Sequence, residues 1–123
     1  MTTPISPPPQ WSRRRQEKQR RLERVRGLAD GAVLPRERLV AALEALIAPG
    51  DRVVLEGNNQ KQADFLSRSL ARVDPGKLHD LHMIMPSVGR PEHLDLFELG
   101  IARKLDFSFS GPQSLRIGQL LED

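Results

Sequence analysis

Short aliphatic segments alternate along this chain with segments whose apolar residues recur at helical spacing. The strand-like segments are residues 52–56, 81–85 and 105–110, and glycine or proline lies beside each of them. Helix-patterned segments precede the first strand-like segment and follow the first two. Helices that alternate with strands in this order predict a parallel sheet with right-handed crossovers, which is the α/β class.

Proline and glycine set the limits of the predicted helices. Pro35 can open the first of them, whose apolar spacing ends at Pro49-Gly50. A second helix is expected between residues 57–59 and residues 74–76, and a third begins at Pro91. The apolar residues expected on their buried faces are Leu39, Val40, Leu43, Leu46 and Ile47; Ala63, Leu66, Leu70 and Val73; and Leu94, Phe97 and Ile101.

The composition of each strand segment predicts how it is covered. Residues 52–56 are β-branched and aliphatic, a pattern typical of a strand covered on both faces, so we expect a central parallel strand. Pro86 terminates the second strand. Residues 105–110 alternate strictly between apolar and polar, which predicts a half-exposed strand. The expected fold is a small open parallel sheet with flanking helices.

Basic side chains are concentrated near the N-terminus. The chain has 123 residues and a net charge of +3, but residues 13–26 hold eight basic and two acidic side chains, a net charge of +6. The remaining residues carry 11 basic and 14 acidic side chains, a net charge of −3. We therefore expect a proline-rich and basic arm over residues 1–30, partly helical or mobile, and an α/β domain over residues 31–123.

The basic arm has three interpretations. Nucleic-acid binding is disfavoured because interleaved aromatic residues and a recognised reading motif are missing. Membrane binding needs a broader apolar face than the stripe of Leu22, Val25 and Leu28 provides. We favour a solvated helix that docks on an acidic patch of its own subunit or of a neighbour.

Composition excludes several classes of protein. The chain contains no cysteine, which excludes disulfides, thiolate nucleophiles and cysteine-ligated metal sites. Its apolar runs span only a few residues and its N-terminus lacks the apolar core of a signal peptide, so we expect a cytoplasmic protein without a membrane span. The sequence contains neither a P-loop nor a dinucleotide fingerprint.

Ligands in open α/β sheets collect beyond the carboxyl ends of the strands. Three turns belong to that edge: residues 56–60, 86–90 and 110–114. The first is the most informative, because Gly57 permits a tight turn and is followed by both asparagines of the chain, Asn58 and Asn59. Free N–H groups at the start of the next helix can hold an oxyanion there. The competing interpretation, which spacing alone favours, is a capping box between Asn59 and Gln62.

The other candidate residues indicate structural roles. Glu56 is at a strand end, where a carboxylate is more often solvated or capping than catalytic. We expect no metal site, because the spacing directs His79 and His82 to different faces and no carboxylates converge with them or with His93. Two serines lack a nucleophile-elbow pattern and are interpreted as turn residues: Ser87 and Ser114.

Three strings of the chain resemble the N-terminal part of the malonate decarboxylase alpha subunit. They read GDRVVLEGNNQKQADFL over residues 50–66, LHMIMPSV over residues 81–88 and FSFSGPQ over residues 107–113. The resemblance covers nearly the whole chain, and the alpha subunit of that family is several times longer. The resemblance therefore implies a truncated subunit. A new apolar pattern that starts at Ile117, close to the last residue, agrees with this expectation.

The resemblance implies an acyl-carrier-protein transferase with a coenzyme A transferase-like domain. Such an enzyme exchanges malonate for the acetyl group held as a thioester on an acyl carrier protein, and other subunits decarboxylate the malonyl carrier protein. No cofactor is expected to bind directly, since the coenzyme A-derived prosthetic group of the carrier protein holds the thioester. The expected partners are the acyl carrier protein and the other malonate decarboxylase subunits.

In related transferases a glutamate from a later part of the chain attacks the thioester, while a glycine-containing loop stabilises the oxyanion. The resemblance assigns this substrate-binding loop to Gly57, Asn58, Asn59 and Gln60. No downstream glutamate is at a strand end in a suitable setting, so we expect the catalytic glutamate outside this chain and no activity from the chain alone. The alternative function is a non-catalytic module whose basic arm binds an acidic partner or nucleic acid.

Overall fold

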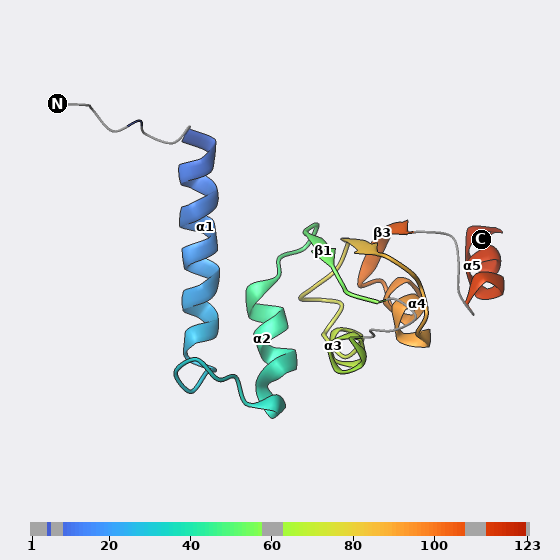
Figure 1. Ribbon diagram of the computed structural model, residues 1–123, viewed down its shortest axis with the longest axis horizontal. Coiled ribbons are helices and arrows are strands. Elements are labelled where there is room, and N and C mark those ends of the chain that lie inside the picture. Colours follow the sequence, from blue (N-terminus) through green and yellow to red (C-terminus); the bar gives the residue numbers. More distant parts are fainter. Residues whose placement is uncertain (1–4, 6–8, 58–62, 108–112, 123) are drawn as a thin grey trace.

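A three-stranded parallel sheet with strand order β1-β2-β3 organises the chain (Figure 1). The computed structural model describes residues 5, 9–57, 63–107 and 113–122. The elements in chain order are α1 (Pro9–Arg26), η1 (Arg36–Arg38), α2 (Leu39–Leu46), β1 (Arg52–Val54), α3 (Asp64–Leu70), β2 (Leu81–Met85), α4 (Pro91–Glu98), β3 (Ala102–Phe107) and α5 (Ser114–Glu122). The predicted α/β class and the predicted order of helices and strands are confirmed.

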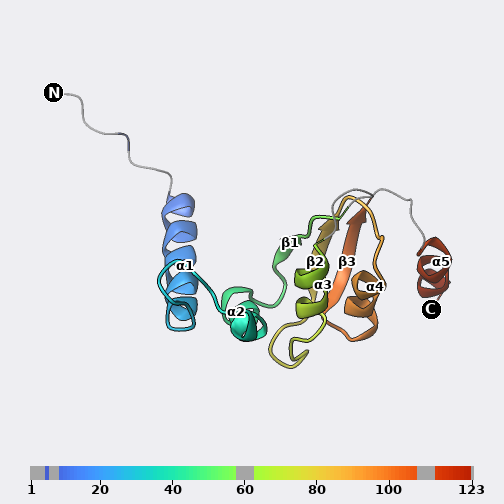
Figure 2. The same ribbon diagram turned by 60° about the horizontal axis from the view of Figure 1, so that its bottom comes forward.

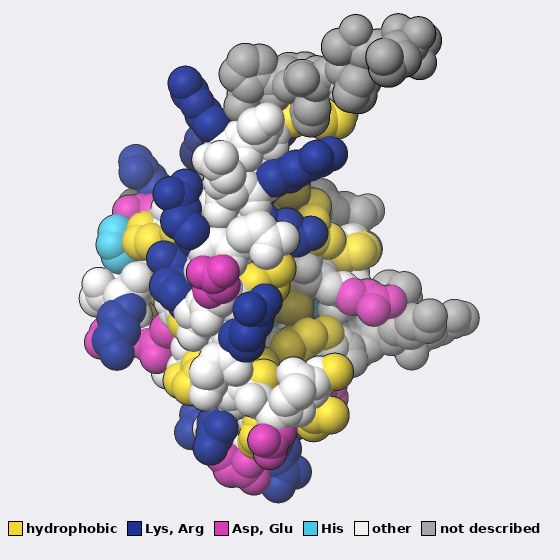
Figure 3. Space-filling view, turned by 90° about the vertical axis from the view of Figure 1, so that its left-hand side faces the viewer, with side chains coloured by type: hydrophobic (Ala, Val, Ile, Leu, Met, Phe, Trp, Pro, Cys, Tyr) yellow, Lys and Arg dark blue, Asp and Glu magenta, His cyan; other side chains and the backbone are white. Residues whose placement is uncertain are grey.

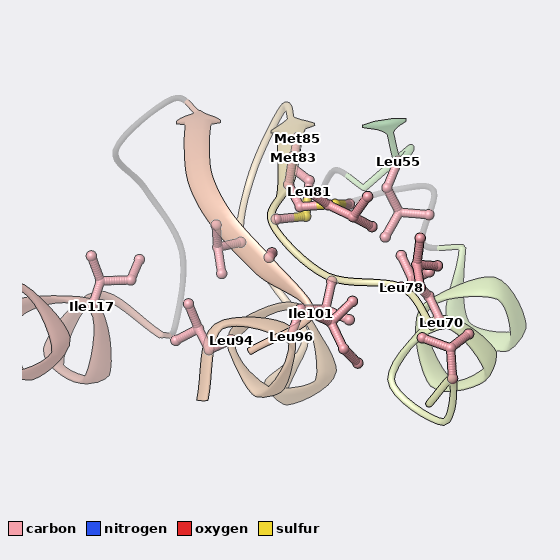
Figure 4. Close-up of a cluster of buried hydrophobic side chains, with 13 residues drawn as sticks. Leu55, Leu70, Leu78, Leu81, Met83, Met85, Leu94, Leu96, Ile101 and Ile117 are labelled. Carbon is pink, nitrogen blue, oxygen red and sulfur yellow. The ribbon is translucent and has the colours of Figure 1, made fainter. Parts of the chain in front are cut away.

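One face of the sheet carries the hydrophobic core, and helices α3 and α4 lie against it (Figure 2). Alternate residues of the central strand β2 are buried, namely Leu81, Met83 and Met85. This alternation follows from the pleat, which directs every second side chain toward the same face. The helices and the adjoining turns add Leu70, Val73, Leu78, Leu94, Leu96 and Ile101 to the cluster (Figure 4).

The opposite face of the sheet is polar at its start. Arg52 of β1 is aligned with His82 of β2, and His82 is aligned with Lys104 of β3. The His82 Nε2 atom lies 2.8 Å from Asp106 Oδ2 on the neighbouring strand. This row of polar residues explains why the sheet buries one face more deeply than the other.

The first strand was expected to be central, but within the described residues β1 pairs with β2 alone and lies at an edge of the three-stranded sheet. Its Val54 side chain is 72% exposed. A short aliphatic run reports that a strand has two apolar faces, but it carries no information about which strands lie beside it. The pairing order therefore had to come from the structure.

Two further expectations need correction. Leu66 was expected on the buried face of its helix but is 43% exposed, and the fully buried position belongs to its neighbour Ser67. The third strand begins at Ala102 rather than at Leu105, because pairing with β2 extends it toward its start. The predicted strand residues 108–110 lie outside the described residues.

The basic helix α1 packs beside α2 through specific contacts (Figure 1). Arg21 forms an ion pair with Asp51, which precedes β1. Arg24 Nε donates to the carbonyl oxygen of Ala45 at 3.1 Å, near the end of α2, where helix carbonyls lack partners within the helix. Partial burial raises the pKa of Asp51, but the hydrogen bonds that its carboxylate accepts from Arg21 and from the Ala48 N–H have the larger combined effect. The pKa of Asp51 is therefore below its ordinary value. Two arginines thus fix α1 to the α/β domain.

Helix α5 is joined to α4 by one arginine. Arg116 lies 2.8 Å from Asp95 and 2.7 Å from Glu98, and it also donates to the Pro91 carbonyl at 3.1 Å. The hydrogen bonds that Arg116 donates to Glu98 and Asp95 raise its pKa above the ordinary value. No helix in the described part of the chain has the length and apolar character that a membrane crossing requires.

Candidate functional site

The turns that follow β1 and β2 meet at the carboxyl edge of the sheet (Figure 2). Gly57 is buried, and its carbonyl oxygen accepts two hydrogen bonds from Ser87. The Ser87 N–H donates at 3.0 Å and its hydroxyl at 2.8 Å. The first residue of the predicted substrate-binding loop is therefore held against the turn after β2.

The other predicted loop residues, Asn58, Asn59 and Gln60, lie outside the described residues. Gln62, the partner of Asn59 in the alternative capping box, also lies outside them. The described structure therefore gives the two ends of this loop, at Gly57 and Ala63. A capping box of Asn59 and Gln62 at α3 is wrong, because α3 begins at Asp64 with Ala63 at its N-cap, while substrate binding by the asparagines stays a prediction.

The far end of the loop is held by a partly buried network of hydrogen bonds that begins in the turn before α4. The Arg90 N–H lies 3.4 Å from Nδ1 of His93 and donates to it. His93 Nε2 lies 3.1 Å from the Ser67 hydroxyl, which donates to the Ala63 carbonyl at 2.7 Å. Because Nδ1 accepts and the Ser67 proton is already engaged, the network assigns the imidazole proton to Nε2. Every polar group in this network of hydrogen bonds has a partner while His93 is neutral.

Ala63 is also connected back to the strand that precedes the loop. Its N–H lies 3.3 Å from the carbonyl oxygen of Glu56, to which it donates. The loop therefore leaves β1 and enters α3 at two fixed points, one held by Ser87 and the other by Ser67 and Glu56.

Burial makes the protonated form of His93 unfavourable. The ring is fully buried, and this desolvation lowers its pKa from the ordinary value of 6.5. Glu92 and Asp64 raise the pKa and Arg90 lowers it, but these effects are smaller than that of burial. The imidazole is therefore neutral near neutral pH, as the hydrogen-bonded chain requires.

This shift predicts a pH dependence of stability. Since the folded state binds the His93 proton less readily than the unfolded state, the free energy of unfolding decreases as pH falls below about 6.5. Above that value the contribution of neutral His93 is complete. We expect thermal unfolding midpoints between about pH 5 and about pH 7 to change less for His93→Gln than for the unaltered protein. Equal changes in both proteins would contradict this assignment.

Asp64 and Arg90 add charge beside the same turns. Arg90 lies 3.4 Å from Asp64 Oδ2 and 3.3 Å from Glu92 Oε2. The other carboxylate oxygen, Asp64 Oδ1, is buried, and it is the one buried side-chain oxygen without a hydrogen-bond partner in the described part of the chain. A buried acceptor of this kind is commonly satisfied by water or by a bound molecule.

The remaining candidates lie elsewhere. Glu56 is exposed, and the three histidines contact three different partners: Asp80 for His79, Asp106 for His82 and Ser67 for His93. Within the described ranges no three ligating side chains gather as a metal site would require. The pairing of Ser67 with His93 was not predicted from the sequence. The spacing could have predicted that Ser67 is buried, because it lies four residues after Ala63 and three before Leu70, on the face of the helix that carries these apolar residues.

Comparison with known proteins gives the family. Residues 10–123 match the family described as malonate decarboxylase, alpha subunit, transporter. An acetyl-S-ACP:malonate ACP transferase of Malonomonas rubra is 48% identical over 95 residues, which are 77% of this chain and 17% of that protein.

Two solved structures have the same fold. The crystal structure of a Pseudomonas malonate decarboxylase hetero-tetramer in complex with malonate includes a chain that is 99% identical with a TM-score of 0.90. This similarity covers 95% of the present chain and 21% of that chain. The malonate decarboxylase alpha subunit of Acinetobacter baumannii is 70% identical with a TM-score of 0.89, over 92% of the present chain and 21% of its own. The chain spans about a fifth of the length of these relatives, and it belongs to the malonate decarboxylase alpha subunit family.

Proposed function

We propose that this chain is an N-terminal segment of an acetyl-S-ACP:malonate ACP transferase. In the proposed reaction a malonyl group replaces the acetyl group in the thioester of an acyl carrier protein. Malonyl carrier protein and acetate are the products, and the other subunits of the decarboxylase then remove carbon dioxide from the malonyl group. The identity of 48% with a transferase of that name supports the assignment.

The observation that carries the proposal is the turn after β1, whose two ends are held by hydrogen bonds from Ser87 and Ser67 at the carboxyl edge of the sheet. Acyl transfer places negative charge on the thioester oxygen, and donors fixed in advance lower the barrier more than mobile ones do. In our proposal Gly57, Asn58, Asn59 and Gln60 provide these donors. A glutamate outside residues 1–123 attacks the thioester carbonyl, and the C–S bond breaks to give an acetyl-glutamyl anhydride and the free thiolate of the carrier protein.

The carrier protein brings its acyl group on a coenzyme A-derived prosthetic arm, so the chain itself holds no cofactor in this proposal. The arm contains amide N–H groups, and Asp64 Oδ1 is a buried acceptor beside the loop with its bonding capacity free. The partners are the acyl carrier protein and the other decarboxylase subunits.

The experiment that tests this function uses the full-length alpha subunit that carries this sequence. Acetylated carrier protein and malonate are supplied, and the mass of the intact carrier protein is followed by mass spectrometry. We expect conversion to malonyl carrier protein, none without malonate, and none with residues 1–123 alone. If the full-length subunit leaves the acetyl carrier protein unchanged, the transferase assignment is wrong and the alternative of a binding module gains support.

A further inference from the structure

The turns that follow β1 and β2 are joined to each other at two points. At their starts, the Gly57 carbonyl accepts hydrogen bonds from the N–H and from the hydroxyl of Ser87. At their ends, Ala63 and Arg90 are joined by a path that contains the side chain of His93. Between about pH 5 and about pH 8 an imidazole can change its charge, whereas a hydroxyl and a peptide group cannot. Of these two connections, only the one through His93 can therefore respond to pH.

His93 contacts both turns with the two nitrogens of its ring. On one side, Nδ1 accepts a hydrogen bond from the Arg90 N–H at 3.4 Å. On the other side, Nε2 lies 3.1 Å from the Ser67 hydroxyl, which donates to the Ala63 carbonyl at 2.7 Å. His93 and Ser67 are both fully buried, and every one of these contacts joins residues of this chain. The connection therefore does not depend on a surface that another segment has to leave open.

Protonation of the imidazole removes one side of this connection. In the imidazolium both nitrogens carry hydrogen, so Nδ1–H and the Arg90 N–H become two donors that face each other. The new charge is also buried, and in the described part of the chain no carboxylate accepts a hydrogen bond from the ring. Glu92 on the same helix and Asp64 on α3 attract the charge, and Arg90 repels it. Only the neutral ring can therefore hold both turns at once.

We propose that His93 is a positioning residue, which in its neutral form joins the turns after β1 and β2 and which releases them when it is protonated. The inference rests on the proposed function, in which the acyl group is exchanged at the edge that these turns form. Acid then slows exchange because groups that must reorganise stabilise the transition state less, and malonate binding is affected little. Because His93 is fully buried, it has no contact with substrate in this proposal and acts through Ser67 and Arg90.

Two conservative replacements of His93 in the full-length alpha subunit separate the two sides of the connection. The amide oxygen of His93→Asn can occupy the position of Nδ1 and keeps an acceptor for the Arg90 N–H. The amide nitrogen of His93→Gln can occupy the position of Nε2 and keeps a donor beside Ser67. Neither amide titrates. The matched control is His79→Gln, which removes an exposed imidazole before the start of β2, at the opposite end of that strand.

Two measurements are made on each protein at about pH 5 and about pH 7.5. Initial rates with acetylated carrier protein and varied malonate give kcat and KM. Acidification also changes the charge of malonate and of surface carboxylates, which lie among basic side chains on the face shown in Figure 3. These effects cancel when kcat of a variant is divided by kcat of the unaltered subunit at the same pH. Hydrogen–deuterium exchange over residues 63–70 and 86–96, corrected for the intrinsic effect of pH, reports the connection without the reaction.

We expect both His93 variants to lower kcat about fivefold at the higher pH, with KM within about twofold of the original value. At the lower pH, the ratio of variant kcat to unaltered kcat is expected to rise at least about twofold, because protonation removes the same connection from the unaltered subunit. Hydrogen exchange over both segments is expected to become faster on acidification in the unaltered subunit and to change less in the His93 variants. The ratio for His79→Gln is expected to stay constant.

Three results would overturn the proposal. Unchanged kcat in both His93 variants, or a change in KM alone, would remove the positioning role. A kcat ratio that is the same at both pH values would remove the release by acid. Equal protection of both segments at the two pH values in the unaltered subunit would do the same, and this comparison needs no variant that has to fold. Absence of malonate exchange in every protein contradicts the proposed function, while hydrogen exchange still decides whether His93 joins the two turns.

Discussion

Replacement of Asn58 and Asn59 together by alanine is expected to lower the rate of malonate exchange by the full-length subunit about a hundredfold or more. Removal of one preorganised donor from an oxyanion hole costs about 10²–10³ in kcat. The two asparagines follow Gly57, whose carbonyl accepts hydrogen bonds from Ser87 at the carboxyl edge of the sheet, which is the edge that the proposed reaction uses. Initial rates with acetylated carrier protein at several malonate concentrations give kcat and KM separately.

Gln62→Ala is the matched control for this prediction. If the loss of polar side chains between Gly57 and Ala63 acts only through folding, exchange and unfolding midpoint change alike in this variant and in the double asparagine variant. If Asn58 and Asn59 contact the reacting thioester, Gln62→Ala leaves kcat within about threefold of the unaltered subunit. A double asparagine variant with full kcat would remove these residues from the proposed site.

The sequence predicted the fold where local pattern and tertiary packing agree. The expected strand at residues 81–85 is β2 with the same bounds, because every second side chain is buried and Pro86 ends it. The expected helix at Pro91 is α4, which begins at that residue. In both cases a proline and an apolar period specify the same limits, so no long-range information is needed.

The sequence failed where the answer depends on pairing between distant segments. The position of β1 at the edge follows from its partner strands, and its own residues cannot report them. Similarly, Ser67 is buried in contact with His93, which lies 26 residues further along the chain. A pattern that scores only apolar residues assigns the buried position to Leu66 instead. The loop role of Gly57 to Gln60 came from resemblance, and the structure adds the contacts that hold its ends.

Ser67→Ala is expected to cost more than the equivalent change at Ser69, two residues away on the same helix. Both hydroxyls donate at 2.7 Å to the carbonyl four residues earlier, Ser67 to Ala63 and Ser69 to Phe65, and both side chains are buried. Only Ser67 also contacts His93. Its loss leaves the His93 Nε2–H buried without an acceptor, which destabilises a protein by about 1–3 kcal/mol. Ser69→Ala is expected to cost about 0.5–1 kcal/mol.

A second comparison separates the hydrogen bond from packing. In a subunit that already carries His93→Leu, the additional change Ser67→Ala is expected to cost less than it does alone, because the stranded donor has been removed. Unfolding midpoints of the four proteins complete this double-mutant cycle. Equal costs of Ser67→Ala in both backgrounds would show that the contact between Ser67 and His93 contributes nothing to stability.

The same variants connect stability with the proposed exchange. Ser67→Ala removes the connection between α4 and the residue where the loop enters α3, so the donors of the loop are less well fixed. Donors that must reorganise during the reaction stabilise the transition state less. We therefore expect Ser67→Ala to lower kcat with little change in KM, while Ser69→Ala leaves both near their original values. Measurements are made well below the unfolding midpoint of each variant, so a loss of kcat common to both would count against preorganisation through Ser67 and His93.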